Sequence, residues 1–448
     1  MKHSTDTPAG NEVKKLKRDI DEITRAGVRH YELYELTSKE IKDTLVANCT
    51  VPPTQADPEP VCVACVGVVQ HAEGFVDEIV DRFHKEGYIT KTFNMNVTLP
   101  TSTLIRNHAL QIFWHQKLST LPESVVDIKE VFKLLISKPV ERSTGLTLDF
   151  ERKKIQCGDG RHNVVKALTL VSDERFASVG NVPPTAVETK PELESIEMTR
   201  ESVFVGGRYL KYTRDVSQTP WSVGTTILAE LSVSGIVCDT VKNAFRASDY
   251  KFVTAGREDA NVRMLGNGRP FYMELINPRI PTLPHEIIKG LETQINVIMP
   301  DKVQVRSLAS IKPEDTKIIK EGEDTKTKSY SALCWTSNPV DQDMIDAVNA
   351  HTNKAFFVEQ QTPIRVLQRR AQMIRRKEIH SLKAFPLEGH FLVVHLHTEA
   401  GTYIKEFVHG DLGRNQPSLA SIVGCEADIM ELDVLEVDLE FPPPERFQ

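Results

Sequence analysis

A proline-rich and acidic stretch near the middle of the chain places the strongest limit on how the chain can fold. The segment has consecutive prolines at Pro183 and Pro184, followed by the acidic run Glu192-Leu193-Glu194-Ser195-Ile196-Glu197. Prolines cannot donate backbone hydrogen bonds, and clustered like charges favour solvent, so this composition is typical of a linker. A chain of 448 residues also exceeds what one ordinary hydrophobic core accommodates. We therefore predict a linker over residues 176–200 with a separate domain on each side.

Composition and charge narrow the class of protein. The chain is 40% hydrophobic and 26% charged, as globular domains are, and its formal net charge is −7. It has no run of about 18 apolar residues, so no membrane-spanning helix is expected, and its polar start predicts no signal peptide. Seven cysteines is an odd number, which favours reduced thiols in the cytoplasm or the nucleus. Because the net charge is negative, any contact with nucleic acid must come from local basic patches.

The part before the linker is predicted to hold one domain. A polar lead-in and a proline-rich loop occupy residues 1–60, and residues 61–175 combine helical and strand patterns. The second half of this domain is basic, which fits either a solvated face or a phosphate-binding face. The apolar spacing predicts helices over 74–87, 103–118 and 125–136 and strands over 91–99, 146–150 and 164–170.

Two cysteines open this domain with the spacing of a zinc knuckle. Cys62 and Cys65 are separated by two residues, but a tetrahedral structural zinc site needs four ligands. Cys49 and either His30 or His71 could complete the set, although none stands at a standard spacing. Burial of two apolar thiols explains the pair as well, so the residues leave zinc binding and core packing both open.

Beyond the linker, residues 201–448 are predicted to form a larger domain around a glycine- and arginine-rich stretch. Residues 255–271 follow a β-prone run and carry arginines, glycines and one acid pair, Glu258 and Asp259. Glycines allow close approach of the backbone, arginines suit phosphate, and neighbouring cations keep a carboxylate ionised. The stretch predicts a polyanion site with an acid at its centre, and a glycine-rich hairpin with a solvated charge cluster is the alternative. Helices are expected over 225–231, 286–298 and 341–350. Strands are expected over 303–308, 325–335 and 429–439, and a further strand begins at residue 391.

Two further segments combine cations with aromatic or apolar side chains. Over 204–221 cations alternate with aromatics, which suits nucleic acid because charges neutralise phosphates and rings stack on bases. An exposed strand with ordinary cross-strand pairs is the alternative. Residues 363–377 form the densest basic patch, which fits a β-hairpin carrying arginines on an exposed edge and predicts a binding surface. The candidate RNA-binding side chains are Arg208, Tyr209, Lys211, Arg214, Trp221, Arg369, Arg370 and Arg375.

The last conspicuous turn begins at Gly401. Gly401 breaks a strand, and Thr402 could cap the helix that follows, which would place Lys405 in its first turn. His395 and His397 share one face of the preceding strand without a third metal ligand nearby, so we expect them to be structural or adjacent to RNA.

Three short motifs, in this order, resemble those of the pseudouridine synthases. Gly256-Arg257-Glu258-Asp259 resembles their Gly-Arg-x-Asp signature, Lys328-Ser329-Tyr330 their Lys-x-Tyr strand motif, and Gly401-Thr402-Tyr403-Ile404-Lys405 their Gly-Thr-Tyr-Ile-basic motif. The longer stretches 207–221 and 401–414 resemble the archaeal and eukaryotic Pus-ten family of tRNA pseudouridine synthases. The resemblance covers about residues 200–440 strongly and about 62–170 more weakly.

The resemblance implies roles for the residues that match the motifs. Asp259 resembles the catalytic aspartate, which acts at C1′ of the ribose as a nucleophile or as a base. Tyr330 resembles the tyrosine that stacks on the target base, and Lys405 the basic partner of the aspartate. Arg257 resembles the arginine that holds the target nucleotide flipped out of its stack, and Leu432 the apolar residue beneath the base. Segments 208–221 and 363–377 resemble the family's forefinger and thumb loops, which grip RNA.

The resemblance also implies a fold, and two departures qualify it. The expected fold class is α+β, with an N-terminal accessory α/β domain that has a THUMP-like part, followed by a catalytic domain whose mixed, mainly antiparallel central sheet is flanked by helices. Relatives often have an aspartate where this chain has Asn261, which leaves Asp259 as the aspartate of the motif. Relatives also carry an earlier CxxC, where this chain has 27-Gly-Val-Arg-His-Tyr-31. The resemblance implies that catalysis needs no cofactor. A structural zinc at Cys62 and Cys65 would lack its usual second cysteine pair.

The sequence therefore predicts a tRNA pseudouridine synthase, an isomerase that acts on uridine 54, or on 55, in the TΨC arm. It is expected to act on tRNA as a monomer, in the cytoplasm, the nucleus or both, without a membrane or a nucleotide cofactor. The alternative is an RNA-binding or RNA-processing factor, for example in small-RNA maturation, whose role does not need catalysis. A different THUMP-bearing tRNA modifier, such as a methyltransferase, lacks support because no glycine-rich nucleotide-binding turn lies between a strand and a helix.

Overall fold

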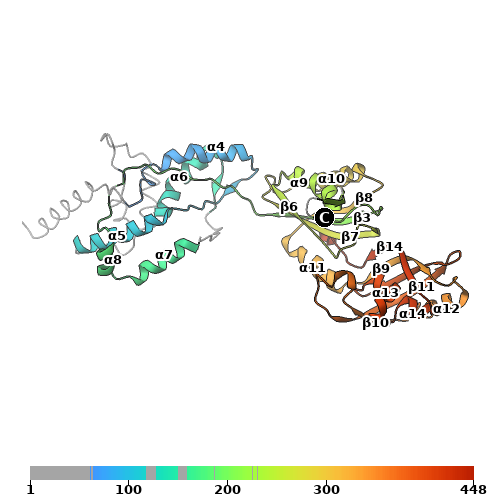
Figure 1. Ribbon diagram of the computed structural model, residues 1–448. Helices are drawn as coiled ribbons and strands as arrows, with labels where there is room; N and C mark the ends of the chain where they lie inside the picture. The colour runs from blue at the N-terminus through green and yellow to red at the C-terminus, as the bar shows by residue number, and fades with distance from the viewer. Residues whose placement is uncertain are drawn as a thin grey trace, which may run out of the picture. The chain divides into compact units, whose positions relative to one another are not determined.

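The computed structural model divides the chain into two compact units, Met1–Met198 and Thr199–Gln448, which are described one at a time (Figure 1). The structure describes residues 61, 64–117, 128–149, 159–185, 187–223, 226–229 and 231–447. Within these ranges, no helix combines the length and the apolar character that crossing a bilayer requires.

The first unit is mainly helical, with a short parallel strand pair. Its core gathers side chains from neighbouring helices, among them Phe75, Leu110, Phe132 and Ile136. The strands pair only where Thr92 lies opposite Thr147 and Phe93 opposite Leu148. The elements are η1 (Ala72–Phe75), α4 (Val76–Glu86), β1 (Thr92–Phe93), α5 (Thr101–Lys117), α6 (Ile128–Thr144), β2 (Thr147–Leu148), α7 (Asp159–Leu170) and α8 (Asp173–Val179).

Two strand predictions in this unit need correction. Residues 164–170 are not a strand but the second half of α7, where Leu168 packs beside Phe176 of α8. A short apolar run does not distinguish a strand from a packed helix, so the tertiary contact decides. Residues 91–99 alternate as predicted, with Met95 and Val97 packed against the core, but the paired strand extends only over β1.

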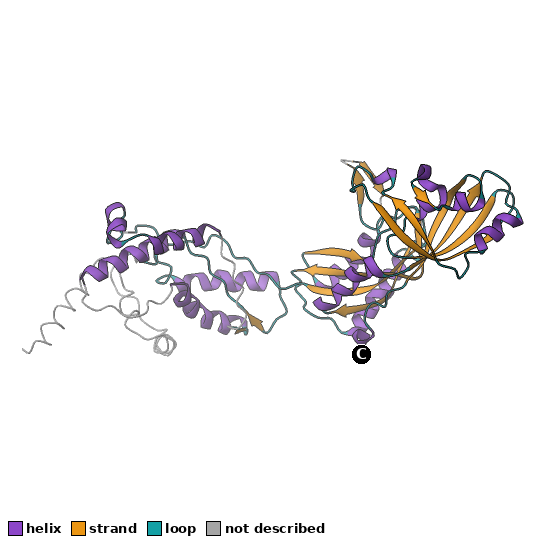
Figure 2. Ribbon diagram, turned by 90° about the horizontal axis from the view of Figure 1, so that it is seen from below, coloured by secondary structure: helices purple, strands orange, loops and turns teal. Residues whose placement is uncertain are grey.

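The second unit is built on one large sheet of ten strands, ordered β13-β10-β11-β12-β9-β14-β7-β3-β8, with β6 paired to β7. Figure 2 shows these strands in orange with purple helices packed on them. Neighbours are antiparallel, except that β14 runs parallel to β7, so the predicted mixed, mainly antiparallel sheet is confirmed. The strands are β3 (Val203–Lys211), β6 (Asp249–Thr254), β7 (Val262–Ile276), β8 (Val303–Ile311), β9 (Lys328–Thr336), β10 (Phe356–Gln361), β11 (Ile374–Pro386), β12 (Phe391–Thr398), β13 (Asn415–Gln416) and β14 (Ala427–Val437).

Helices flank this sheet and a small hairpin of β4 (Trp221–Val223) and β5 (Thr226–Ala229) stands apart from it. The hairpin corrects the helix predicted over 225–231, because the β-branched Thr226 and Ile227 pair with β4 instead. The helices are α9 (Val233–Phe245), α10 (His285–Ile298), α11 (Thr316–Thr325), α12 (Gln342–Asn349), α13 (Ile404–His409) and α14 (Leu419–Val423), with short 3₁₀ turns η2 (Pro313–Asp315), η3 (Ile364–Val366), η4 (Gly410–Gly413) and η5 (Pro444–Phe447).

The centre of the sheet brings the sequence motifs together. On β14, Leu432 lies opposite Val262 of β7 on one side and Ala332 of β9 on the other. Tyr330 of β9 is paired with Val434, two residues further along β14. Because β7 begins directly after the loop that carries Asp259, and α13, which carries Lys405, packs against β14, the three motif-bearing segments converge around β14.

Candidate active site

Asp259 and Lys405 form an ion pair at this convergence. Asp259 lies in the loop between β6 and β7, and its Oδ2 accepts a hydrogen bond from Lys405 Nζ at 2.8 Å. The Asp259 side chain is 54% exposed and that of Lys405 24%. Lys405 lies in the first turn of α13, as predicted, but Thr402 does not cap this helix: its hydroxyl donates to the Glu399 carbonyl, and Tyr403 is the N-cap. The carboxylate is therefore both cation-bound and accessible to a ligand.

The electrostatic surroundings keep Asp259 ionised. Partial burial raises the pKa of this carboxyl, whereas the hydrogen bond and charge of Lys405 and the charges of Arg365 and Arg257 lower it, and the net effect is a pKa below the ordinary value. An accessible carboxylate that stays charged at neutral pH can act as a nucleophile or as a base.

A buried polar cluster holds the loop from behind. Glu258, whose side chain is 2% exposed, lies with Oε2 at 2.7 Å from Nε of the equally buried Arg269. The Tyr209 hydroxyl donates to the same carboxylate at 2.7 Å and receives a hydrogen bond from Gln218 Nε2 at 2.8 Å. Arg269 also donates to the Ala255 carbonyl at 2.7 Å. Glu258 therefore anchors the loop, while its neighbour Asp259 faces outwards.

Lys211 completes this support from below the loop. Its fully buried ammonium donates to the main-chain oxygens of Val216, Asp259 and Ala260, at 2.8, 3.2 and 2.7 Å. Burial lowers the pKa of Lys211 to about 8, although the Glu258 charge acts in the opposite direction. Fixing these carbonyls fixes the direction in which Asp259 leaves the backbone.

This role corrects part of the predicted RNA-binding set. Tyr209 and Lys211 are fully buried, so neither can reach RNA. The Arg208 guanidinium donates its hydrogen bonds to the main-chain carbonyls of Asn267, Gly268, Val437 and Leu439. Arg214 is ion-paired with Glu431 and Asp433 at 2.6 and 2.8 Å. Cations and aromatics alternate along β3 because this strand supplies hydrogen-bond donors to the buried cluster. Trp221 begins β4, and its side chain lies outside what the structure describes.

Tyr330 and Leu432 lie on the neighbouring strands β9 and β14, where the partner of Tyr330 is two residues beyond Leu432. Tyr330 is partly buried and packs against the core, while Leu432 is 8% exposed. Burial raises the pKa of Tyr330 to about 12, with the Arg269 charge acting to lower it and Glu258 to raise it. The phenol therefore stays neutral at physiological pH and offers an uncharged ring and hydroxyl.

The basic segment forms the connection between β10 and β11. These strands pair as a hairpin up to Gln361 and Ile374, and the intervening loop exposes Arg369 and Arg370. Arg370 Nη1 donates to the Tyr403 hydroxyl at 3.3 Å, and Arg375 Nη1 to Thr362 Oγ1 at 3.3 Å. The predicted arginine-bearing loop thus stands beside the start of α13.

The cysteine pair remains a prediction. Cys62 lies outside the described residues, as do Cys49 and His30, while Cys65 is buried with its sulfur at 3.5 Å from the Val69 amide. Among the residues that the structure describes, no group of three or more His, Cys, Asp or Glu side chains is arranged to hold a metal.

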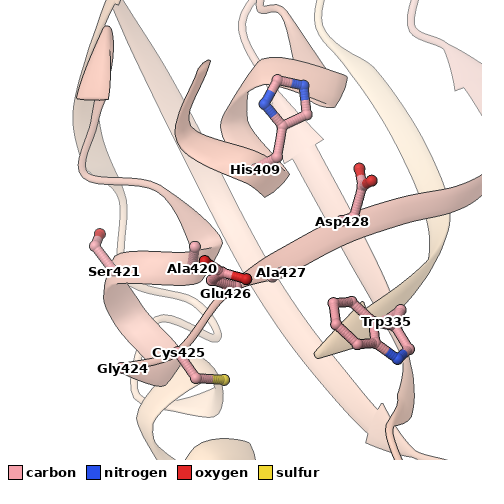
Figure 3. A pocket seen from close by; sticks show the side chains of 9 residues that line it. All are labelled: Trp335, His409, Ala420, Ser421, Gly424, Cys425, Glu426, Ala427 and Asp428. Atoms are coloured by element: carbon pink, nitrogen blue, oxygen red, sulfur yellow. The ribbon is translucent and has the colours of Figure 1, made fainter. Parts of the chain in front are cut away.

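A hollow on the second unit is lined by residues of β9, α13, α14 and β14 and of the turn before β14 (Figure 3). Trp335 on its rim is five residues beyond Tyr330 along β9, which corresponds to roughly 16 Å of extended strand. None of the residues that line the hollow is among those that the motifs single out. Its lining residues are Trp335, His409, Ala420, Ser421, Gly424, Cys425, Glu426, Ala427 and Asp428.

Sequence reasoning missed three residues of this arrangement. Glu258 occupies the variable position of the Gly-Arg-x-Asp motif, and neither Gln218 nor Arg365 is among the candidate site residues that the sequence indicates. A signal existed for Arg365, since it lies in the basic segment that was assigned to RNA. For Glu258 and Gln218 no local signal existed, because their burial depends on partners from distant strands.

Comparisons with known proteins find similar sequences along most of the chain. The family model described as "Pus10, C-terminal" matches residues 204–438, and "Eukaryotic Pus10, N-terminal" matches residues 62–158. The tRNA pseudouridine synthase Pus10 of Mus musculus is 36% identical over 421 residues, which covers 86% of this chain and 79% of the relative. That of Homo sapiens is 34% identical with the same coverage. The structure titled "Crystal Structure of a Cbf5-Nop10-Gar1 Complex" covers 52% of this chain and 48% of that chain, at 15% identity and a TM-score of 0.29, so the family relationship rests on sequence.

Proposed function

The chain belongs to the Pus10 family and is a tRNA pseudouridine synthase, an isomerase, and from this premise we propose that its target uridine lies in the TΨC arm of tRNA. Position 54 is the favoured target and position 55 the second candidate. The proposal extends the family relationship to a target site through the resemblance of the motifs.

The Asp259–Lys405 ion pair is the observation that carries the proposed chemistry. Asp259, kept ionised, acts at C1′ of the target nucleotide, either by attacking it or by removing a proton from the ribose. In both routes the N-glycosidic bond breaks, the uracil rotates, and its C5 bonds to C1′; this new bond displaces the Asp259 carboxylate from C1′ in the first route, whereas the ribose regains its proton in the second. C5 then loses its proton and N1 gains one, so that product and substrate have the same atoms. A cation partner that orients the carboxylate without neutralising it suits either route.

Binding of the nucleotide is assigned to the residues around this pair. A uridine inside a stacked arm must be extruded before its C1′ can be reached. Tyr330 offers the ring that stacks on the uracil and Leu432 the apolar surface beneath it, while the exposed Arg257 holds the flipped nucleotide. The loop arginines Arg369, Arg370 and Arg375 contact the tRNA backbone.

The remaining assignments concern the whole chain. We propose that residues 61–175 act as an accessory RNA-binding domain with a THUMP-like part, joined by the 176–200 linker to a catalytic domain at 201–448. The enzyme is proposed to work as a monomer, in the cytoplasm, the nucleus or both.

A direct test uses purified protein, an unmodified tRNA transcript and chemical mapping of pseudouridine. We expect the wild type to modify position 54, and transcripts with cytidine at 54 or at 55 identify the target. Asp259→Asn should abolish activity, whereas Asp428→Asn, which removes an exposed carboxylate outside the three motifs, should not. Full activity in Asp259→Asn would refute the assigned chemistry, and modification outside the TΨC arm would refute the target.

A role independent of catalysis is the alternative, favoured by the exposure of the loop arginines Arg369 and Arg370. It predicts that cells carrying Asp259→Asn keep the phenotype of the wild type, while reversal of the charges at Arg369 and Arg370 abolishes it. The opposite pattern would assign the phenotype to pseudouridine formation.

A further inference from the structure

Arg365 connects the basic loop to the helix that carries Lys405. It lies in η3, within the connection between β10 and β11, and its Nε donates to Glu406 Oε1 at 2.8 Å. Glu406 directly follows Lys405 in the first turn of α13. Charge-assisted hydrogen bonds of this kind are short and directional, so the position of the loop and the position of Lys405 are linked through one contact.

The burial of Glu406 makes this contact costly to break. Its side chain is 4% exposed, whereas that of Arg365 is 47% exposed. The second carboxylate oxygen, Oε2, is buried without a hydrogen-bond partner among the described residues. An unpaired buried carboxylate is strongly unfavourable, so the ion pair with Arg365 favours a loop that stays docked on α13.

Arg365 also acts on the catalytic carboxylate. Besides Lys405 of α13 and Arg257 of the same loop as Asp259, it is one of the charges that lower the pKa of Asp259 against the effect of burial. In return, burial lowers the pKa of Arg365 while Glu406 and Asp259 raise it, to a net increase. Lys211 faces the loop from beneath, at the main-chain oxygen of Asp259.

The root of the loop is fixed to the segment that follows α13. Arg414 Nη2 donates to the Thr362 carbonyl at 2.8 Å, and the Ile364 amide donates to Asp411 Oδ2 at 3.4 Å. Asp411 and Leu412 have φ values of 47° and 57°, a left-handed backbone that is unfavourable for residues other than glycine. The surrounding contacts hold this backbone in place, so both ends of α13 are tied to the loop.

We propose that Arg365 is a positioning residue of the active site. The connection between β10 and β11, residues 362–373, is the RNA-gripping loop of this proposal; it carries Arg365 to α13, where Arg365 aligns Lys405 with Asp259. Its guanidinium also places a second cation beside that carboxylate. A tRNA that shifts or orders the loop thereby changes the alignment of the ion pair, so engagement of the loop and chemistry are coupled. The inference rests on the proposed role of Asp259.

The test separates chemistry from tRNA binding with single-turnover rates at saturating enzyme, measured from pH 3 to 8, because the pKa of Asp259 lies below its ordinary value. Arg365→Met removes the charge and should lower the rate by roughly ten- to hundredfold, the size expected for a small misplacement of reacting groups. It should also move the acid limb of the profile to higher pH, because a cation that favours the ionised Asp259 is lost. Arg365→Lys keeps the charge and should keep the acid limb of the wild type.

Two further variants make the outcome decisive. Arg369→Met, on the same loop, should weaken tRNA binding and leave the acid limb in place. Because Arg365→Met leaves Glu406 unpaired, the double variant Arg365→Met/Glu406→Gln removes that cost and should fold like the wild type, yet remain slow with a shifted acid limb. A double variant with the wild-type rate and limb would overturn the proposal, as would a defect of Arg365→Met confined to tRNA affinity. If Asp259→Asn were active, the assigned chemistry itself would fail, independently of Arg365.

Discussion

The buried pair of Glu258 and Arg269 gives a prediction whose magnitude follows from the structure. Each side chain is 2% exposed, and the ion pair spans 2.7 Å. Glu258→Met would leave the Arg269 charge buried without its carboxylate, and removal of one partner of such a pair costs about 3–5 kcal/mol. For a unit of this size, that corresponds to a fall in Tm of about 6–20 °C. Urea unfolding of the full chain, followed by fluorescence and circular dichroism, measures the loss.

A double variant separates stability from function at the same site. Glu258→Met/Arg269→Met removes both charges and should recover most of the stability, since apolar replacement of a whole buried pair is often neutral. Activity should not recover, because Arg269 no longer holds the Ala255 carbonyl and Glu258 no longer holds Tyr209. Lys251→Met breaks an exposed pair with Glu274 and should cost less than about 1 kcal/mol.

Either of two results would refute this reasoning. If Glu258→Met lost no more stability than Lys251→Met, the pair would not be a buried anchor. If the double variant regained the wild-type rate, the cluster would stabilise the fold without positioning Asp259.

Three further predictions address the ion pair, the backbone and the loop. Lys405→Met removes the main cation that lowers the pKa of Asp259 against burial, so the acid limb of the single-turnover profile should move to higher pH, and an unmoved limb would contradict the pairing. Gly266→Ala places a Cβ 1.9 Å from a main-chain oxygen of β14, at a φ of +59°, and should lower Tm. The control is Gly290→Ala, whose Cβ meets nothing within 4 Å, and which should lower Tm less. Equal Tm values of the two variants would argue against the parallel pairing of β7 and β14. Arg369→Glu should weaken tRNA binding and flatten its salt dependence by about one phosphate contact, and an unchanged slope in filter binding would remove this arginine from the interface.

The elements that the sequence predicted well are those specified by local patterns. The helices at α5, α10 and α12 and the strands β8, β9 and β14 follow apolar periodicity within each segment, and Lys405 falls in the first turn of α13 because Gly401 ends the extended backbone. The pairing of these strands required contacts between distant segments, and the wrong strand at 164–170 shows that a short apolar run alone does not decide the secondary structure.

The predicted RNA surface over 204–221 was wrong at Tyr209 and Lys211 for a related reason. An alternation of cations and aromatics is typical of an exposed binding strand, but the same alternation arises when a core strand delivers hydrogen-bond donors to buried acceptors. The distinction depends on Glu258 and on the carbonyls of the 259–260 loop, which lie about fifty residues further along the chain. No pattern within the strand identifies those partners.

The same arrangement occurs on both sides of the proposed catalytic pair. Asp259 is preceded by Glu258, which is buried and ion-paired with Arg269, and Lys405 is followed by Glu406, which is buried and ion-paired with Arg365. Each member of the proposed catalytic pair is thus adjacent in sequence to an acid anchored by an arginine. Since neighbouring residues share a peptide bond, each anchor limits the direction of its neighbour to a narrow range. On this reasoning the alignment of Asp259 with Lys405 depends on two separate ion pairs, one next to the sheet and one on the loop between β10 and β11, and the second, whose arginine is half-exposed, is the pair that we propose tRNA engages.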